Sequence, residues 1–319
     1  MMFSRASASL SRGLRIAQML GLHRLDSPRQ TMISTLPPPE DWCELEERRR
    51  TWWVIFCSDR FVSGVTGWPA LIHEKDVATL LPASDDSFEQ GLEEETGLLA
   101  DALQGTLAYS SFAGKILSAY VYHKTLDHTF QTSPGDSPED VKNGPYWKRH
   151  REIDSHLHNL IMYLPERLRL PQNAKDNNAL FFTISIYSST ICIHRAALAK
   201  VREFDLPGSM FLWSKLRLLP AADEVVNALK LAVDIQSILL DHYVAFSAYL
   251  VALVFLESYK ELPSQRSQSS LEFLLSSLVA CGRQDLFTRS LALQLARGMT
   301  QCEVRSSALA EVLRFGFLY

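Results

Sequence analysis

Apolar residues recur at three- and four-residue intervals along most of this 319-residue chain, and strict alternation is scarce. That spacing matches the α-helix, in which side chains return to one face about every 3.6 residues. The segment from Trp42 to Val62 shows it most clearly, with an apolar stripe through Trp52 and Phe56. The pattern therefore predicts an all-α fold, a multi-helix domain with irregular loops.

The same segment carries charged pairs in the order that stabilises a helix. Glu44 precedes Arg48 by four residues, and Glu46 precedes Arg50 by the same interval. Such pairs lie side by side on a helix surface. Both pairs are expected to form.

The remaining elements are expected at intervals along the chain, separated by polar or proline-containing connections. Helices are predicted over residues 1–21, 98–129, 147–163, 178–198, 222–240, 243–259, 271–280 and 289–317. Connections are predicted around Pro28, over 84–97, 133–145, 203–219 and 264–270. The expected organisation is a domain over residues 1–263, a linker over 264–270 and a C-terminal helical extension over 271–319.

Composition narrows the class of protein. Hydrophobic residues make up 47% and charged residues 21%, which is ordinary for a globular chain and excludes a collagen-like fibre or a disordered tail. A net charge of -4 excludes a basic field over the whole chain that would hold nucleic acid by its phosphates. The five cysteines are dispersed and odd in number, which favours a reducing compartment.

Two segments raise the question of targeting. The most apolar stretch, Tyr243 to Leu256, is shorter than the roughly 20 residues that cross a bilayer, so no membrane partner is expected. Residues 1–21 contain three arginines and no acid, which is typical of a mitochondrial presequence. The alternative is a helix of the folded domain, because Leu10, Leu14, Ala17 and Gly21 follow one helical face. A mitochondrial helical protein stays open as an alternative.

The chain contains none of the sequence signatures of a catalytic serine, a metalloprotease helix or a phosphate-binding loop. Asp85, Asp86 and Glu89 are similar to the acidic motif that holds magnesium in all-α isoprenoid enzymes, because hard cations prefer oxygen ligands. A solvated acidic loop explains these three residues as well. A magnesium-dependent enzyme is therefore kept only as an alternative, and the chain is expected not to be an enzyme.

Two further clusters have a structural and a functional interpretation. His150, Asp154 and His158 share one helical face, with His156 beside them, so zinc ligation is conceivable, although exposed polar residues of a helix explain them too. The triplet Arg48-Arg49-Arg50 suggests nucleic-acid contact, but Glu44, Glu46 and Glu47 precede it and neutralise its field. Neither cluster is adopted as a site.

Three stretches together resemble the regulatory "middle homology" domain of fungal zinc-cluster transcription factors. The family pattern A-x-x-L-G-L-H-R is matched from Ala17 to Arg24, and E-x-R-R-R-x-W-W-x-x-F-x-x-D-R from Glu46 to Arg60. Gly67-Trp68-Pro69 follows in order, with Trp68 where the family usually has arginine, and a weaker match ends at His194-Arg195-Ala196. The signature residues are Leu20, Gly21, Leu22, His23, Arg24, Glu46, Arg48, Arg49, Arg50, Trp52, Trp53, Asp59, Arg60, Gly67 and Pro69.

The resemblance implies a nuclear domain that regulates RNA polymerase II transcription in response to a small-molecule inducer or a regulatory protein. The family's DNA-binding region is a six-cysteine zinc cluster upstream, so zinc and DNA contact are expected only there, and this chain is expected to be an N-terminally truncated or stand-alone regulator. No catalytic or metal-binding residue is implied.

The signature residues are expected to be structural. Trp52 and Trp53 should anchor the core, each with a partner for its indole N–H. Asp59 is expected to accept from Arg24 or from one of Arg48 to Arg50. Helices over 187–198 and 243–259 are rich in Tyr, Phe and Ile, and are the segments expected to line an apolar inducer pocket, with no ligand-binding residue assigned.

Overall fold

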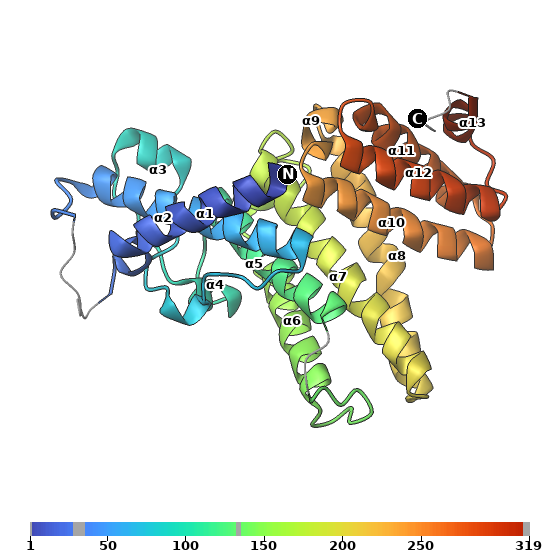
Figure 1. The fold of residues 1–319 in the computed structure, drawn as a ribbon, viewed down its shortest axis with the longest axis horizontal. Helices are drawn as coiled ribbons and strands as arrows, with labels where there is room; N and C mark the ends of the chain where they lie inside the picture. The colour runs from blue at the N-terminus through green and yellow to red at the C-terminus, as the bar shows by residue number, and fades with distance from the viewer. Residues whose placement is uncertain (1, 28–35, 132–134, 315–319) are drawn as a thin grey trace. The chain divides into compact units, whose positions relative to one another are not determined.

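The computed structural model describes residues 2–27, 36–131 and 135–314. All regular secondary structure in these ranges is helical, which confirms the all-α prediction (Figure 1). The chain forms two compact units. The first contains residues 1–131 and 155–169, and the second contains residues 132–154 and 170–319.

The first unit is built around one long helix, α2 (Trp42–Thr66), which packs against α1 and α5. Trp52, Trp53 and Phe56 on its inner face are completely buried. The other elements of this unit are α1 (Met2–Met19), η1 (Leu22–Arg24), η2 (Glu74–Asp76), α3 (Asp85–Gln90), α4 (Leu99–Leu103), α5 (Ser111–Phe130) and η3 (Glu166–Leu168). Helix α6 (Pro145–Met162) belongs to the second unit up to Asp154 and to the first from Ser155.

Both ends of α2 are set by local chemistry. The Asp41 side chain accepts from the backbone N–H of Glu44 at the N-terminus. Gly67 ends the helix with φ of 69°, a left-handed conformation that costs glycine nothing. Gly21 plays the same part after α1, with φ of 76°.

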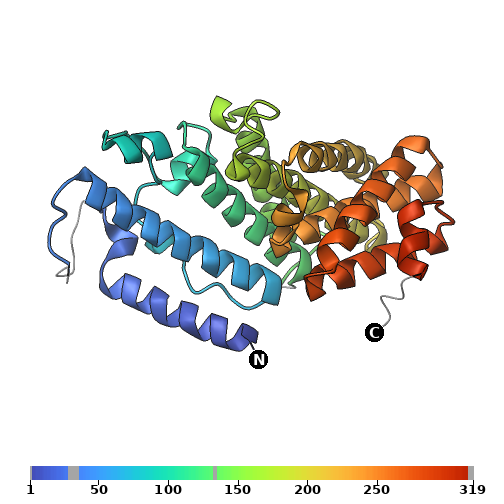
Figure 2. The same cartoon turned by 90° about the horizontal axis from the view of Figure 1, so that it is seen from above.

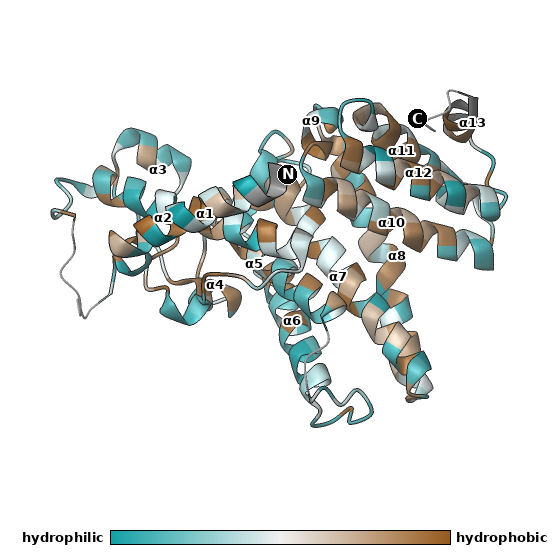
Figure 3. Cartoon of the chain, viewed as in Figure 1, coloured by the Kyte–Doolittle hydropathy of each residue, from teal (hydrophilic) through white to brown (hydrophobic). Residues whose placement is uncertain are grey.

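The second unit is a bundle in which α10 is the central helix, in contact with α7, α8, α9, α11 and α12. Figure 3 shows the hydrophobic residues concentrated along its helices α7, α8 and α10. Helix α7 packs against α8 and α10, whereas α13 packs against α11 and α12. The helices are α7 (Asn177–Glu203), α8 (Gly208–Leu231), α9 (Ile235–Leu239), α10 (His242–Glu261), α11 (Gln265–Gly282), α12 (Leu286–Gln301) and α13 (Ser307–Arg314).

Helix α10 is the one described helix that is long and apolar enough to cross a membrane by length and composition. It packs against α7, α8, α11 and α12, and Val251 and Phe255 on it are completely buried. A core helix of a folded domain has these properties.

Two expected elements of the first unit are different in the structure. The single helix expected over 98–129 is two helices, because Gly105 adopts φ of 75° after α4 and the Ser110 hydroxyl caps the start of α5. The loop expected over 84–97 contains the short helix α3, whose first turn is capped by Ser84. Serine side chains that satisfy free N–H groups favour such starts.

Two connections expected in the second unit are helical. Residues 208–219 form the first half of α8 rather than an irregular connection, and α8 continues through Pro220. The polar linker expected over 264–270 is wrong as local structure, because Ser264 caps α11 and the helix begins at Gln265. The helices expected over 222–240 and 289–317 are each divided, the first between α8 and α9 and the second between α12 and α13. The connection expected around Pro28 and residues 315–317 of the last predicted helix lie outside the described residues.

Candidate functional site

The signature segments meet in the first unit, where two backbone stretches far apart in sequence run side by side. The N–H of Ala78 donates to the carbonyl of His23 at 2.8 Å, and the N–H of Asp26 donates to the carbonyl of Ala78 at 3.1 Å. The Thr79 hydroxyl donates to the Leu22 carbonyl at 2.6 Å and accepts from the N–H of Leu25 at 3.1 Å. The turn after α1 is thereby fixed to the segment that follows η2.

The signature residues of this turn differ in their burial and in their contacts. Leu22 is buried and Leu20 is half-buried. The ring of His23 lies 5.7 Å from that of Trp52, measured between centroids. Arg24 donates from Nε to the Asp76 carbonyl at 3.3 Å and lies near its carboxylate.

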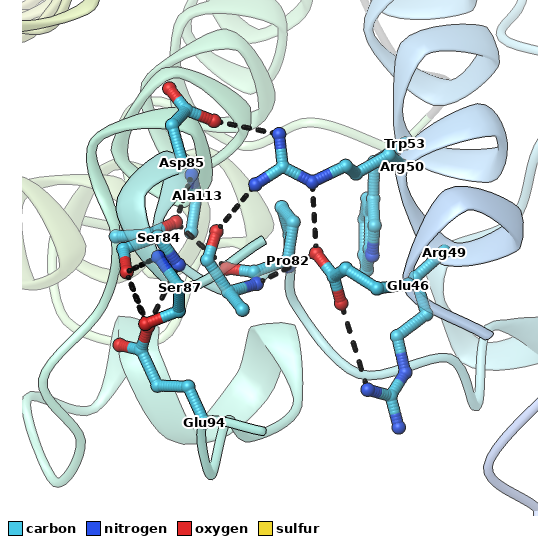
Figure 4. Close-up of polar contacts among 12 residues, drawn as sticks. Glu46, Arg49, Arg50, Trp53, Pro82, Ser84, Asp85, Ser87, Glu94 and Ala113 are labelled. Carbon is cyan, nitrogen blue, oxygen red and sulfur yellow. Dashed lines mark hydrogen bonds and ion pairs between the residues drawn. The ribbon is translucent and has the colours of Figure 1, made fainter. Parts of the chain in front are cut away.

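The arginine triplet on α2 is divided among three different partners. Arg48 bonds to Glu44 and to the Pro37 carbonyl, and Arg49 pairs with Asp26. Arg50 contacts the carboxylates of Glu46 and Asp85 (Figure 4). Each guanidinium is therefore paired, so the triplet does not present a free basic patch to phosphates. The expected pairs of Glu44 with Arg48 and Glu46 with Arg50 are confirmed.

Glu46 is the buried centre of this network. One carboxylate oxygen accepts from the backbone N–H of Ala83 at 2.9 Å and from Arg50 Nε at 3.0 Å. Arg50 also donates to the Ala83 carbonyl at 2.9 Å. Burial raises the pKa of Glu46, although the charges of Arg50 and Arg49 act in the opposite direction. Two side chains of α2 thus hold the backbone of residue 83 from both sides.

The segment beyond Ala83 is held by a second set of hydrogen bonds, drawn in Figure 4. The backbone N–H and the hydroxyl of Ser84 both donate to Glu94. Burial acts to raise the pKa of Glu94, but the hydrogen bonds from Ser84 hold it below the usual range. The Ser110 hydroxyl donates to the Pro82 carbonyl at 2.7 Å, which connects this segment to α5.

The two indoles of α2 have different surroundings. Trp53 donates its N–H to the Leu80 carbonyl at 2.7 Å, which confirms the expected partner. Trp52 is equally buried, but its N–H has no acceptor within the described residues. The expectation that each indole has a partner is therefore wrong for Trp52, whose stabilising contribution is apolar burial.

Asp59 has different partners from those expected. Its carboxylate accepts from the backbone N–H groups of Leu71 and Ile72, at 3.0 and 3.1 Å, and not from an arginine of the triplet or from Arg24. Arg60 is buried, donates to the Ile72 carbonyl at 2.6 Å, and its guanidinium carbon lies 4.5 Å from the centre of the Phe56 ring. Burial lowers the pKa of Arg60. Together the two residues fix the loop after α2.

The remaining signature residues lie in that loop. Gly67 ends α2, Pro69 is exposed, and Trp68 is 47% exposed. Trp68 therefore does not fill a position in the core.

The candidate zinc cluster has other contacts. Asp154 forms a two-point pair with Arg217, at 2.9 and 3.0 Å, and lies 3.6 Å from Nε2 of the buried His194. His194 Nδ1 lies 3.3 Å from the Ser214 hydroxyl. In the described part of the chain, no three His, Cys, Asp or Glu side chains are placed to hold a metal ion.

The three acidic residues considered as magnesium ligands also have different surroundings. Asp85 pairs with Arg50, whereas Asp86 and Glu89 are exposed on α3. A cation-binding set of carboxylates is not assembled from these three residues.

Sequence reasoning missed Asp26 and the acceptors on the backbone. Asp26 accepts from Arg49 Nε at 3.1 Å and from the N–H of Leu80 at 2.8 Å, so it joins α2 to the segment that follows η2. The one sequence feature that could have pointed to Asp26 is its position, two residues after the first signature segment. The carbonyl and N–H groups of Ile72, Leu80 and Ala83 give no signal in a sequence.

Comparisons with known proteins agree with this placement of the signature. Residues 10–159 match the fungal specific transcription factor domain family. The chain is 28% identical, over 80% of its length, to the pigment biosynthesis transcriptional activator pigB of Monascus ruber, and covers 46% of that protein. It is 27% identical over 70% of its length to the citrinin biosynthesis transcriptional activator mrl3 of the same organism, covering 43% of it.

A third relative is the azaphilone cluster-specific transcription factor azaR of Aspergillus niger. It is 31% identical over 56% of this chain, which covers 38% of azaR. The chain thus spans less than half the length of these curated relatives. No solved structure matches it.

Proposed function

Because residues 10–159 form a fungal specific transcription factor domain, we propose that this chain is the regulatory part of a nuclear activator of a biosynthetic gene cluster. The observation that carries the proposal is that match, which covers the turn after α1, the whole of α2 and the segment fixed to them. The names of the relatives support the part of the proposal that concerns a biosynthetic gene cluster. They are described as activators or cluster-specific factors for pigment, citrinin and azaphilone biosynthesis.

In this proposal DNA is read by a zinc-cluster region outside residues 1–319. The arginines of α2 are paired with acids of the same unit, and the net charge of the chain is -4, so the electrostatic basis for holding a duplex is weak. The five cysteines are single thiols, of which Cys57, Cys192 and Cys281 are buried. We expect the chain by itself to take up neither zinc nor a specific DNA site.

The proposed output is a change in RNA polymerase II transcription, in response to an inducer or a regulatory protein. A ligand can shift such a domain only through unequal affinity for two of its conformations. Helices α7 and α10 are the proposed place for an apolar inducer, because they pack against each other and against α8. No individual residue is assigned to that role.

The test is a fusion of the full chain to a heterologous DNA-binding domain, assayed on a reporter in fungal cells. We expect output different from that of the DNA-binding domain alone. Trp52→Ala should return the output to that level, because it removes a completely buried side chain of the signature helix. Val54→Ala, at a position 53% exposed on the same helix, is the matched control and should behave as wild type. Equal output from the fusion and the DNA-binding domain alone, under several growth conditions, would contradict the proposal.

A second experiment addresses the DNA-binding part. The purified chain is desalted for metal analysis and tested in gel shifts against a set of duplex sites. Stoichiometric zinc, or sequence-specific binding that resists salt, would contradict the assignment of DNA reading to another region.

A further inference from the structure

Helix α1 presents a face that is both basic and apolar. Arg5, Arg12, Arg15, Ile16 and Met19 are all exposed on it, and we call these residues the basic face. The three arginine side chains form no ion pair or hydrogen bond within the described residues. Ile16 and Met19 are 57% and 66% exposed, beside Arg12 and Arg15. The opposite face, with Leu14 and Ala17, is the one buried in the first unit.

The charge of this face is not balanced locally in the sequence. The first 25 residues contain no aspartate or glutamate. In contrast, every arginine of the α2 triplet has an acidic partner. The basic face therefore differs from the arginine triplet of α2, whose guanidinium groups are paired with acids of the same unit.

The same unit also carries the opposite kind of surface. Residues 85–95, which we call the acidic segment, contain six acids and no basic residue. Asp85 and Glu94 are used internally, by Arg50 and Ser84. The side chains of the other acids have no partner within the described residues, and all of them are exposed; they are Asp86, Glu89, Glu93 and Glu95. Leu92 among them is 57% exposed.

The two surfaces do not neutralise each other within one molecule. Helices α1 and α3 lie on opposite sides of α2 (Figure 2). At about physiological salt, charges act on one another over only about 8 Å. The two sets of charges are separated by at least the diameter of α2 with its side chains, which is about 10 Å. This separation exceeds the screening length, so they do not neutralise each other within the unit.

We propose that the basic face docks onto the acidic segment of a second copy of this chain. Both surfaces place exposed apolar side chains among charges of a single sign: Ile16 and Met19 among arginines, and Leu92 among glutamates. Arg12 and Met19 are about 10 Å apart along the helix axis, which gives an extended strip rather than a single point of contact. Opposite potentials steer the encounter and set the register, and the apolar side chains lose contact with water.

Sedimentation velocity of the full chain tests the proposal. Self-association is expected at about 0.1 M salt and should weaken strongly at about 1 M, where the screening length falls to about 3 Å. Arg12→Glu/Arg15→Glu should weaken association at least tenfold, or by about 1.4 kcal/mol or more. Glu89→Lys/Glu93→Lys should do the same. All four positions are exposed, so both variants should melt as the wild type does.

The decisive measurement mixes the two reversed variants. Arg12→Glu/Arg15→Glu and Glu89→Lys/Glu93→Lys should associate with each other, because each supplies the charge that the other has lost. Lys148→Glu/Lys175→Glu is the matched control for Arg12→Glu/Arg15→Glu, since it makes the same change in net charge at two other exposed positions. This control should associate as the wild type does.

Three results would overturn the proposal. The first is a monomer at every concentration at low salt, and the second is self-association that neither charge reversal changes. The third is binding of duplex DNA that Arg12→Glu/Arg15→Glu removes, in a chain that does not self-associate. That result would assign the basic face to a nucleic acid instead.

Discussion

Arg49 and Asp26 form a two-point ion pair that joins α2 to the turn after η1. Both guanidinium Nε and Nη2 reach the carboxylate, and the Nε contact is 3.1 Å. The same carboxylate accepts the backbone N–H of Leu80 at 2.8 Å. The side chains of Arg49 and Asp26 are only 7% and 14% exposed. One carboxylate therefore connects three segments of the chain in a place that water barely reaches.

Arg49→Ala is expected to lower the free energy of unfolding by about 3 kcal/mol, because it leaves a buried carboxylate without its ion partner. Asp26→Asn should cost a similar amount. A double-mutant cycle measured by urea denaturation should give a coupling energy of about 1–3 kcal/mol. Independent, additive effects would show that the pair contributes nothing as a pair.

Trp52→Ala is expected to lower the free energy of unfolding by about 3–5 kcal/mol, since the indole is completely buried and leaves a large cavity. Val54→Ala, two residues away on the exposed side, should change it by less than about 0.5 kcal/mol. The measurement is the denaturation midpoint of each variant. An unchanged midpoint for Trp52→Ala would mean that this face of α2 is not the core face.

Gly67 and Gly13 allow a matched test of backbone conformation. Nothing lies within 4 Å of a Cβ atom built at either position, so the effect of an alanine on stability depends on the backbone conformation alone. Gly67→Ala should destabilise by about 1–2 kcal/mol, because Gly67 has a φ of 69°. Gly13→Ala, inside α1, should stabilise by about 0.5–1 kcal/mol. Thermal melts should move in opposite directions, and a shift of both in one direction would contradict the assignment.

His123 on α5 should make stability depend on pH. Burial, and then the charges of Arg60 and Lys124, lower its pKa from 6.5 to about 4. Between about pH 6.5 and 4 the unfolded chain therefore binds a proton that the folded chain does not, so stability falls as pH falls. The loss should reach about 3 kcal/mol near pH 4.

The check for His123 is the free energy of unfolding of wild type and His123→Gln at several pH values. Because glutamine does not titrate, the difference between the two proteins should change over this window and be constant above it. A constant difference from about pH 7 down to pH 4 would contradict the depressed pKa.

The cysteines should react in an order set by burial. Cys57 and Cys192 are buried, and burial raises the pKa of each thiol to about 12, so neither supplies thiolate at neutral pH. Cys43 and Cys302 are only half-buried. Titration with a thiol reagent should modify these two first, and Cys57 and Cys192 only after denaturation. Early modification of Cys57, identified by peptide mapping, would contradict its burial in the core of the first unit.

The main helices could be predicted from the sequence because their signals are local. The start of α2 after Asp41, its turn at Gly67, and the pairs of Glu44 with Arg48 and Glu46 with Arg50 depend on residues a few positions apart. The first half of α8 could not be predicted. Pro220 normally argues against a helix interior, yet here the helix continues past it, with Ala221 and Ala222 buried on its inner side.

The arrangement of the signature residues depends on contacts that no local pattern encodes. Arg49 is 23 residues from Asp26, and Trp53 is 27 residues from its acceptor on Leu80. Asp59 was expected to accept from Arg24 or from one of Arg48 to Arg50, but two backbone N–H groups donate to it, and the arginine beside it is Arg60. Which of several chemically suitable partners a side chain contacts is decided by the path of the whole chain.

The hydrogen bonds that hold residues 71–83 need a specific side chain at one end and only a backbone group at the other. The side-chain partners belong to α2 and are Glu46, Arg50, Trp53 and Asp59, each of a specific chemical type. At the other end are N–H and carbonyl groups, which almost every amino acid possesses. The hydrogen bonds to this backbone therefore do not depend on which side chain the segment carries, except that proline at a donor position would remove its N–H. Its side-chain identity is constrained separately, by the burial of Ile72, Thr79 and Leu81. Replacement of any of the four holding residues, in contrast, removes a hydrogen bond directly.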